Sequence, residues 1–322
     1  MCTTIGFHYK EGHVFGRTLE ITQALAHQIL YVPKNTQDFF KTSEGRTYET
    51  RFSTIGTGFF DQPSFGDGIN EKGLMGSNNF FPAYATFAKE CSEDRINLIS
   101  SEAFDFLLTR CQDVEEVKAT AATINLLAQN AAGVKSMSMH FFFMDQQGAT
   151  VVLEPREGSL IAHDNPYGVL TNAPDFSWHA TNLKNYLHLK PENIESSHFN
   201  DVTLTKLGEG NGLVGLPGDF TPPSRFIRAA YFVAQTPKNL DRQAAIRQAF
   251  RILGQFDIPT GAVGDAANGH CDETLYTSVM DTKQKAYFIK GHNHSFIQAF
   301  QLEDYLTETD IQFVPLQQEK NL

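Results

Sequence analysis

The chain opens with a β-hairpin pattern directly behind Cys2, and this pattern limits what the N-terminus can be. Residues Thr3 to Tyr9 are rich in β-branched and aromatic side chains, Lys10 to His13 form a turn, and the strand pattern resumes from Val14 to Leu19. A chain end is ordered only when its backbone is tied to the rest of the fold, as in a paired strand. The sequence therefore predicts that Cys2 has a fixed place at one end of a sheet.

Cys2 is a candidate nucleophile because aminopeptidases remove an initiator methionine that precedes a small side chain. Loss of Met1 would leave a single residue with a thiol and a free α-amine. The amine titrates near pH ~7.7–8.0, so it can take a proton at neutral pH. A nucleophile activated by its own terminal amine is a known form of covalent catalysis. The alternative is a cysteine in an unstructured tail, against which the hairpin argues.

The second hairpin strand adds two charged residues, Arg17 and Glu20, beside Cys2. A guanidinium favours the thiolate through its opposite charge, and a carboxylate can hold the α-ammonium. The alternative is a solvated pair on the surface.

Further strand patterns cluster toward both ends of the chain, and helical patterns lie between them. The strand patterns are Thr47–Phe60, Gly73–Phe81, Ser136–Met144, Ala149–Leu153, Thr274–Met280, Ala286–Lys290 and Ile297–Leu302. The helical patterns are Ser100–Arg110, Val114–Ala128 after an Asp113 N-cap, Pro223–Ala234 and Asn239–Phe256. Strands joined by hairpins form antiparallel sheets, so we expect an α+β fold with helices layered on the sheet faces. No linker divides the chain, which predicts one domain over residues 1–322.

Composition excludes several function classes. The net charge of −11 argues against nucleic acid and anionic membranes as partners, and no apolar run reaches the length of a membrane span. The N-terminus lacks a signal peptide pattern. The four cysteines are far apart and include no CxxC pair, which indicates a reduced, cytoplasmic protein without a disulfide framework.

Two motifs suggest cofactor or metal chemistry but have better interpretations. Gly210 to Gly215 match GxGxxG, but Pro217 follows at once and forbids the helix that a dinucleotide site requires, so we expect a glycine-rich loop. His292 and His294 have a metal-ligand spacing but no third ligand nearby in sequence, which favours a turn between strands.

The remaining histidines and cysteines are also weak candidates. His140 lies inside an apolar strand pattern and is expected to be a hydrogen-bonded core residue. His270 and Cys271 are sequence neighbours, which rarely face each other in a strand. Cys91 and Cys111 lie near or on predicted helices and are expected to be buried or inert.

Several segments together resemble the choloylglycine hydrolase family, which contains bile salt hydrolases and penicillin V acylases. The segments are Met1–Thr3, Phe15–Glu20, Asn70–Gly76, Gly168–Pro174 and Gly215–Phe226, and they occur in the family's order and approximate spacing. Within the family, the GLMG, ATFA (Ala85–Ala88) and LPGDFTP runs look closer to penicillin V acylases.

The resemblance implies an N-terminal nucleophile hydrolase with a four-layer αββα sandwich built on two antiparallel sheets. It further implies a homotetramer that needs no cofactor and no metal. Carried over by position, Cys2 would be the nucleophile and its α-amine the proton acceptor and donor. Arg17 would lie against the sulfur, Asn172 would donate its side-chain amide to the oxyanion, and Arg225 would complete the polar cluster.

Two positions depart from the family pattern. Glu20 stands where the family has aspartate, so its carboxylate lies one methylene further out. Phe80, with Asn79 before it, stands where bile salt hydrolases have asparagine and penicillin acylases have tyrosine. Phe80 can supply a backbone N–H to the oxyanion but no side-chain hydrogen bond, and its ring favours an apolar or aromatic acyl group.

These observations predict a cysteine-dependent amidohydrolase that cleaves a small-molecule N-acyl amide, in the manner of penicillin V acylases. Conjugated bile salt hydrolysis is the alternative within the family. A catalytically silent binding protein of the same fold is an alternative of another class, and a metal-dependent hydrolase built on His292 and His294 is a further one.

Overall fold

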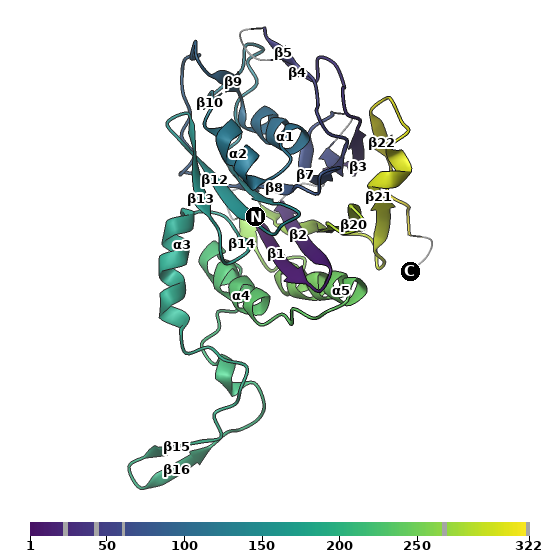
Figure 1. Ribbon diagram of the computed structural model, residues 1–322. Helices are drawn as coiled ribbons and strands as arrows, with labels where there is room; N and C mark the ends of the chain where they lie inside the picture. Colours follow the sequence, from purple (N-terminus) through teal and green to yellow (C-terminus); the bar gives the residue numbers. More distant parts are fainter. Residues whose placement is uncertain (22–24, 42–44, 60–61, 266–268, 320–322) are drawn as a thin grey trace.

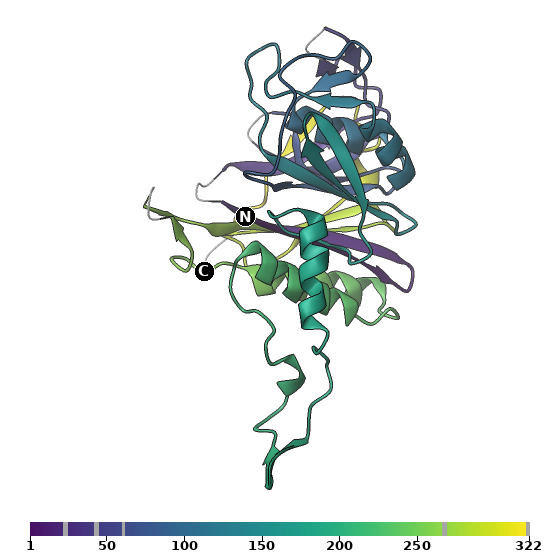
Figure 2. The ribbon, with the colours of Figure 1, turned by 90° about the vertical axis from the view of Figure 1, so that its left-hand side faces the viewer.

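Two antiparallel sheets lie face to face in the centre of the computed structural model, between two pairs of helices (Figure 1, Figure 2). The structure describes residues 1–322 except 22–24, 42–44, 60–61, 266–268 and 320–322. Sheet A has, in spatial order, β14 (Val169–Leu170), β1 (Cys2–Tyr9), β2 (Gly12–Ile21), β19 (Glu273–Asp281), β20 (Ala286–Gly291) and β21 (Gln298–Gln301). Sheet B has β13 (Ser159–Asp164), β12 (Thr150–Arg156), β11 (Met139–Met144), β8 (Met75–Phe80), β7 (Phe65–Asn70), β6 (Thr54–Phe59), β3 (His27–Val32) and β22 (Gln312–Val314).

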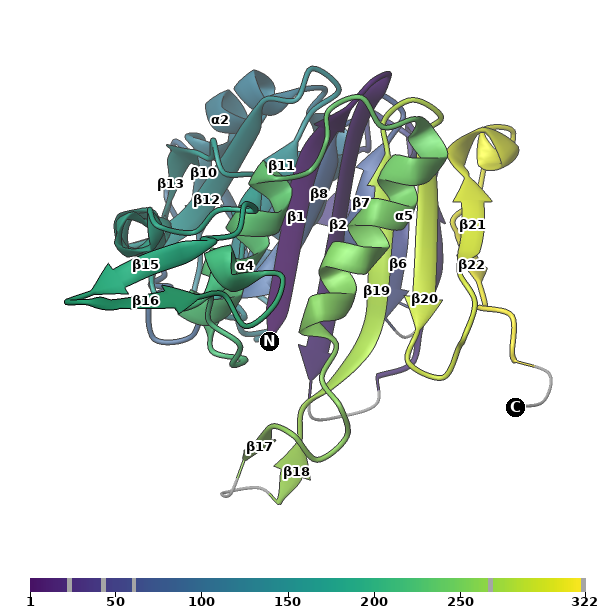
Figure 3. The ribbon, with the colours of Figure 1, turned by 90° about the horizontal axis from the view of Figure 1, so that it is seen from below.

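The helices complete four layers. Helices α1 (Ser100–Arg110) and α2 (Val114–Ala121) pack on sheet B, and α4 (Pro222–Ala234) and α5 (Arg242–Leu253) pack on sheet A. Figure 3 shows α4 and α5 covering one face of sheet A, in front of β1, β2 and β19. The predicted α+β fold with an αββα sandwich and two antiparallel sheets is therefore confirmed.

The first strand is buried on both faces, which explains its near-continuous run of apolar and small side chains. Every residue of β1 except His8 is buried. One face of β1 packs against sheet B and the other against α4 and α5. The predicted N-terminal hairpin is confirmed, with Cys2 opposite Leu19 and Thr4 opposite Arg17.

Short elements fill the connections. They are β4 (Phe40–Lys41), β5 (Thr47–Tyr48), β9 (Ile96–Leu98), β10 (Ile124–Leu126), α3 (Phe176–Asn182), β15 (Ser196–Phe199), β16 (Val202–Thr205), β17 (Gly264–Asp265), β18 (His270–Cys271) and the 3₁₀ turns Leu183–Tyr186, Asn211–Leu213, Gly254–Phe256 and Leu302–Tyr305. Among the described residues, no helix is both long and apolar enough to cross a membrane.

Two predicted elements were too long. The Asp113 N-cap is confirmed, since its carboxylate accepts the Glu116 N–H at 2.8 Å, but α2 ends at Ala121. The following residues form β10, which pairs in parallel with β9 because the apolar side chains of Ile124 and Leu126 are buried there.

The predicted strand Thr47–Phe60 is two separate strands, β5 and β6. The chain turns between them because the N–H groups of Arg51 and Phe52 both donate to the Thr109 carbonyl at the end of α1. Phe60 lies outside the described residues.

A hairpin arm projects away from the layers. Strands β15 and β16 form its tip, and all eight of their residues are exposed. The arm leaves the body after α3 and returns before α4 (Figure 1, Figure 2). The glycine-rich loop predicted near Gly210 lies in the returning part of this arm.

Candidate active site

The thiol of Cys2 lies against the guanidinium of Arg17 between the two sheets. Arg17 Nη2 donates to Cys2 Sγ at 3.0 Å, and Nη1 donates to the carbonyls of Gly66 and Asn78 at 2.8 and 2.9 Å. Both side chains are at most 1% exposed. The two carbonyls fix the direction of the guanidinium. Arg17 lies beside Cys2, where the predicted hairpin placed it, and is a charged donor to the sulfur.

Asp67 on β7 is the counter-charge to Arg17, and sequence reasoning missed it. Its carboxylate lies 3.7 Å from Arg17 Nη1 and is fully buried. It accepts hydroxyl hydrogen bonds from Tyr276 at 2.6 Å, from Ser278 at 2.9 Å and from Tyr287. A buried charge needs such partners. The signal available in sequence was one acid between two glycines inside an otherwise apolar strand.

Asn172 brings a side-chain amide to the nitrogen of Cys2. Its Oδ1 accepts from Cys2 N at 3.0 Å and from Arg225 Nη2 at 2.7 Å, while its Nδ2 donates to the Phe80 carbonyl at 2.7 Å. The path of the chain depends on Gly168, whose φ of +63° and close approach to Gly6 leave no room for a Cβ. This turn starts β14 beside β1 and carries the chain on to Asn172.

Arg225 ties α4 to the start of β1. Its guanidinium donates to the Cys2 carbonyl, to Thr3 Oγ1 at 2.8 Å and to the Phe220 carbonyl at 2.8 Å, in addition to Asn172. It is 1% exposed. The structure thus brings Arg225 and Asn172 together beside Cys2, as predicted.

Met1 precedes β1 and bonds the backbone of Glu20 on β2. Its ammonium donates to the Glu20 carbonyl, and the Glu20 N–H donates to the Met1 carbonyl at 2.9 Å. The Cys2 nitrogen is therefore a peptide amide in this form. Removal of Met1 would turn the same nitrogen into an α-amine that already has Asn172 Oδ1 as a neighbour.

Glu20 lies on the helix-facing side of sheet A. Its carboxylate is 1% exposed, and neither oxygen has a hydrogen-bond partner among the described residues. Burial raises its pKa, although the Met1 ammonium, Arg225, the Thr18 hydroxyl and Arg17 oppose this. Glu20 is therefore a buried acid close to cationic groups, and its oxygens have no hydrogen-bond partner of good geometry among the described residues.

Replacing Glu20 by glutamine is expected to leave stability at pH 7 unchanged or higher while turnover falls by about 10²-fold. The sign follows from the raised pKa: the folded carboxyl binds its proton more tightly than the unfolded one, so ionisation opposes folding as pH rises above about 4.3. Urea unfolding at pH 4 and pH 7 checks this, with the stability gain confined to the higher pH. A loss of stability at pH 7 would contradict it.

Asn79 and Phe80 are neighbours at the end of β8 but differ in their exposure and in their hydrogen-bond partners. Asn79 is fully buried, and its side chain bonds Thr4 Oγ1 at 3.1 Å and the Thr171 carbonyl at 2.9 Å. Its polar side-chain atoms are thus engaged between the sheets, and a contact of Asn79 with the oxyanion or the substrate stays a prediction. Phe80 ends β8, is 36% exposed, and bonds Asn172 through its carbonyl.

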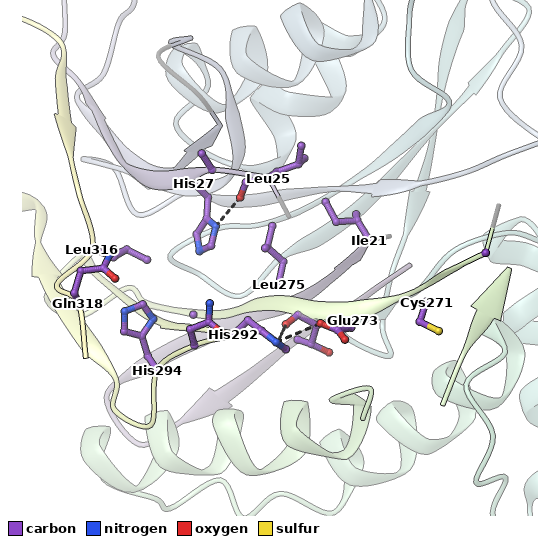
Figure 4. A pocket seen from close by; sticks show the side chains of 15 residues that line it. Ile21, Leu25, His27, Cys271, Glu273, Leu275, His292, His294, Leu316 and Gln318 are labelled. Atoms are coloured by element: carbon purple, nitrogen blue, oxygen red, sulfur yellow. Dashed lines mark hydrogen bonds and ion pairs between the residues drawn. The ribbon is translucent and has the colours of Figure 1, made fainter. Parts of the chain in front are cut away.

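The histidine pair of the HxH motif lies at a separate cavity of about 520 Å³. Figure 4 shows His27 entering from sheet B and His292 and His294 from the turn after β20. His292 bonds the Thr274 carbonyl at 3.1 Å and lies 3.3 Å from the Glu273 carboxylate. Groups of three or more metal-ligating side chains do not occur among the described residues.

The other cysteines lie away from this cluster. Cys91 is exposed, so of the two predicted alternatives, buried or inert, the first is wrong. Cys111 is buried, and burial raises its pKa to about 12, which leaves it an unreactive thiol. Cys271 is half-buried and lines the cavity of Figure 4.

Comparison with known proteins assigns the family. Residues 2–311 match the model for linear amide C–N hydrolases of the choloylglycine hydrolase family. The chain belongs to this family. The sequence resemblance is thereby confirmed, and the protein is a linear amide C–N hydrolase.

Within the choloylglycine hydrolase family, bile salt hydrolases are the more similar relatives. The chain is 33% identical to a bile salt hydrolase/transferase of Clostridium perfringens, over 94% of this chain and 92% of that protein. A variant of the conjugated bile acid hydrolase of the same organism superposes with a TM-score of 0.91 at 30% identity, covering 100% of this chain and 99% of that one. The penicillin V acylase of Pectobacterium atrosepticum is 24% identical, over 70% of this chain and 58% of that protein. The comparisons therefore favour the bile salt alternative over the penicillin V acylase interpretation of the motifs.

Proposed function

We propose that this protein hydrolyses the amide bond of conjugated bile salts through an acyl-thioester on Cys2. The observation that carries the proposal is that both reactive atoms of Cys2 have fixed polar partners: Sγ has Arg17 at 3.0 Å, and the nitrogen has Asn172 at 3.0 Å. The substrate class rests on the bile salt hydrolases among the relatives.

The reaction begins once Met1 is removed. The Cys2 α-amine takes the thiol proton while Sγ attacks the acyl carbonyl carbon, and the amine then gives this proton to the leaving nitrogen as the C–N bond breaks. Water attacks the resulting thioester with the same amine as base, which releases the acid and restores the thiol.

Asn172 is the proposed oxyanion donor. A side-chain amide nitrogen carries two hydrogens, and among the described residues Asn172 Nδ2 uses one of them, toward the Phe80 carbonyl. The second hydrogen and the Phe80 N–H are the proposed pair that stabilises the developing charge. Removing one such donor costs about 10²–10³ in rate.

The charged residues have separate roles in this proposal. Arg17 stabilises the thiolate, and Arg225 holds Asn172 and the Cys2 carbonyl. The Glu20 carboxylate attracts the new α-ammonium across the sheet.

Exposed apolar side chains at and beyond the end of β8, where Phe80 bonds Asn172, suit the steroid part of a bile salt. Phe80 and Tyr84 are 36% and 43% exposed, and Met137 is 47% exposed. Met137 stands two residues before Met139, which pairs with Phe80 at the end of β8. These side chains offer an acyl group area to bury.

The substrate assignment is tested by two release assays on the same preparation. We expect glycine and taurine release from conjugated bile salts at a kcat/KM at least ~10-fold above 6-aminopenicillanic acid release from penicillin V. The reverse order would replace the bile salt proposal by the penicillin V acylase alternative.

Self-association is proposed through the hairpin arm. Phe199, Val202 and Leu204 at its tip are 68%, 57% and 49% exposed, which leaves unburied apolar area that a second copy of the chain would cover. Light scattering of the chain with and without residues 190–215 tests this: the full chain should be an oligomer, and a monomeric full chain would rule it out.

A further inference from the structure

The residue Asn172 lies in a connection rather than in a strand or helix. It belongs to residues 171–176, here called the Asn172 segment, which runs from the end of β14 to Phe176, the first residue of α3. A residue in a connection can hold a fixed position only if its backbone is bound by surrounding groups. The Asn172 segment is bound in this way by buried side chains of other elements.

Three buried groups hold the backbone of the Asn172 segment. His140 Nε2 on β11 lies 3.2 Å from the Thr171 carbonyl, and His179 Nε2 on α3 lies 2.9 Å from the Asn172 carbonyl. The Glu154 carboxylate on β12 accepts the Phe176 N–H at 2.7 Å. The two histidines are fully buried and Glu154 is 3% exposed.

The chemistry of the contacts fixes the protonation of both rings at Nε2. A carbonyl oxygen only accepts, so each Nε2 must carry a hydrogen. Burial lowers the pKa of His179 to about 4, which makes its ring neutral at the pH of any ordinary assay. Its Nδ1 has no hydrogen-bond partner among the described residues, so the one polar task of this ring is to hold the Asn172 carbonyl.

Packing holds the two rings in place. His140 stacks on Phe81 with ring centroids 4.3 Å apart and planes 12° apart, and His179 stacks on Phe226 at 4.7 Å and 14°. Each donor is therefore locked in direction as well as position. Phe226 follows Arg225 on α4, so one turn of this helix supports Asn172 in two ways. Arg225 bonds its side chain, and Phe226 stacks on the histidine that bonds its carbonyl.

Glu154 connects the histidines of sheet B to the end of the Asn172 segment. Its oxygens lie 3.7 Å from His140 Nδ1 and 3.4 Å from His163 Nε2. Burial tends to raise its pKa, but the two imidazoles and the Phe176 N–H outweigh burial and lower it to about 2. Glu154 is thus a carboxylate throughout the range in which the enzyme would be assayed.

We propose that His140, Glu154 and His179 are positioning residues that set the side-chain amide of Asn172 against the reacting atoms. This proposal rests on the proposed function, since it assigns these residues to the step in which Asn172 stabilises the oxyanion. Among the described residues, none of the three makes a hydrogen bond to Cys2 or Arg17. Their effect on the reaction passes through Asn172 alone, where a displacement of about 1 Å can cost 10²-fold.

The test compares His140→Phe, which keeps the ring stack but removes the donor, with His140→Gln, whose amide nitrogen can reach the same carbonyl. We expect His140→Phe to lower kcat by ~10–100-fold with KM within about twofold, and His140→Gln to keep most of kcat. His8→Gln is the matched control, because His8 is an exposed histidine at the far end of β1 and bonds none of the groups that hold the Asn172 segment, so kcat should stay unchanged.

A second readout separates positioning from general loosening of the site. The rate of Cys2 alkylation by iodoacetamide should equal that of the unchanged protein in all three variants, because the Cys2–Arg17 pair is untouched. If His140→Phe does not fold, His179→Phe carries the same expectations. Unchanged kcat in the donor-free variants, or equal losses of kcat and alkylation rate, would overturn the proposal.

Failure of the proposed function itself looks different. In that case the unaltered protein would release no glycine or taurine, or Cys2→Ala would still do so. The positioning proposal is therefore judged only against measured turnover of the unaltered protein.

Discussion

Replacing Cys2 by alanine is expected to abolish turnover, with a loss approaching ~10⁶-fold in kcat, the scale seen when a covalent nucleophile is removed. The loss is this large because the change removes the only atom that can carry the acyl group in the proposed reaction. The fold should remain, since Cys2 is a small buried side chain in a strand held by its backbone. Turnover and a thermal unfolding curve of the variant measure both.

The matched control for this change is Cys91→Ser, which alters an exposed thiol outside the site and should leave turnover unchanged. The same pair of variants separates the alternatives. A silent binding protein would show no turnover and no selective modification of Cys2 by a thiol reagent. A metal-dependent hydrolase built on His292 and His294 would keep turnover in Cys2→Ala and lose it with a chelator.

Replacing Arg17 by methionine is expected to damage both activity and stability. The thiolate loses its charged donor at 3.0 Å, and a loss of at least ~10²-fold in kcat follows from removing one donor aimed at developing charge. The Asp67 carboxylate is left fully buried without its counter-charge, which destabilises a protein by about 3–5 kcal/mol. Urea unfolding and the Cys2 alkylation rate measure the two effects.

Adding Asp67→Asn to the Arg17→Met variant distinguishes the two effects. The second change removes the orphaned charge, so stability should partly return, while kcat stays low because the sulfur still lacks its donor. A single Arg17→Met variant with near-normal turnover would contradict the role given to Arg17. A double variant no more stable than the single one would contradict the pairing of Arg17 with Asp67.

The hairpin and the residues close to Cys2 could be predicted because local pattern decides them. Strand alternation and a short turn fix which residues stand opposite Cys2, and this brought Arg17 and Glu20 beside it. Asn172 and Arg225 came only from the family resemblance, since they lie 170 and 223 positions from Cys2. No periodicity in the sequence could have joined them.

The residues that sequence reasoning missed are those whose role depends on contacts between layers. Asp67 meets Arg17 because sheets A and B stack, and His140 meets the Asn172 segment from the opposite sheet. His140 was predicted as a hydrogen-bonded core residue, which is confirmed, but its partner could not be named. A sequence pattern predicts that a side chain is buried, but only the packed structure shows which residues it contacts.

Some strands of sheet B were missed, and for one of them the reason is again close packing between elements. Strands β3 and β7 were not predicted, and β7 in particular carries glycines that weaken a strand signal. In the structure Gly56 and Gly68 let β6 and β7 pack closely, since a Cβ on Gly56 would lie 2.0 Å from the Asp67 carbonyl oxygen. Close packing requires glycines, and glycines lower the strand propensity of the sequence, so propensity alone does not predict β7.

The most direct test of the account is the mass of the protein trapped by acid during turnover, with the labelled peptide identified. The account predicts a chain that lacks Met1 and carries one acyl group, with the acyl group on the peptide that begins at Cys2. Turnover by a protein that retains Met1, or an acyl group on any other residue, would contradict it.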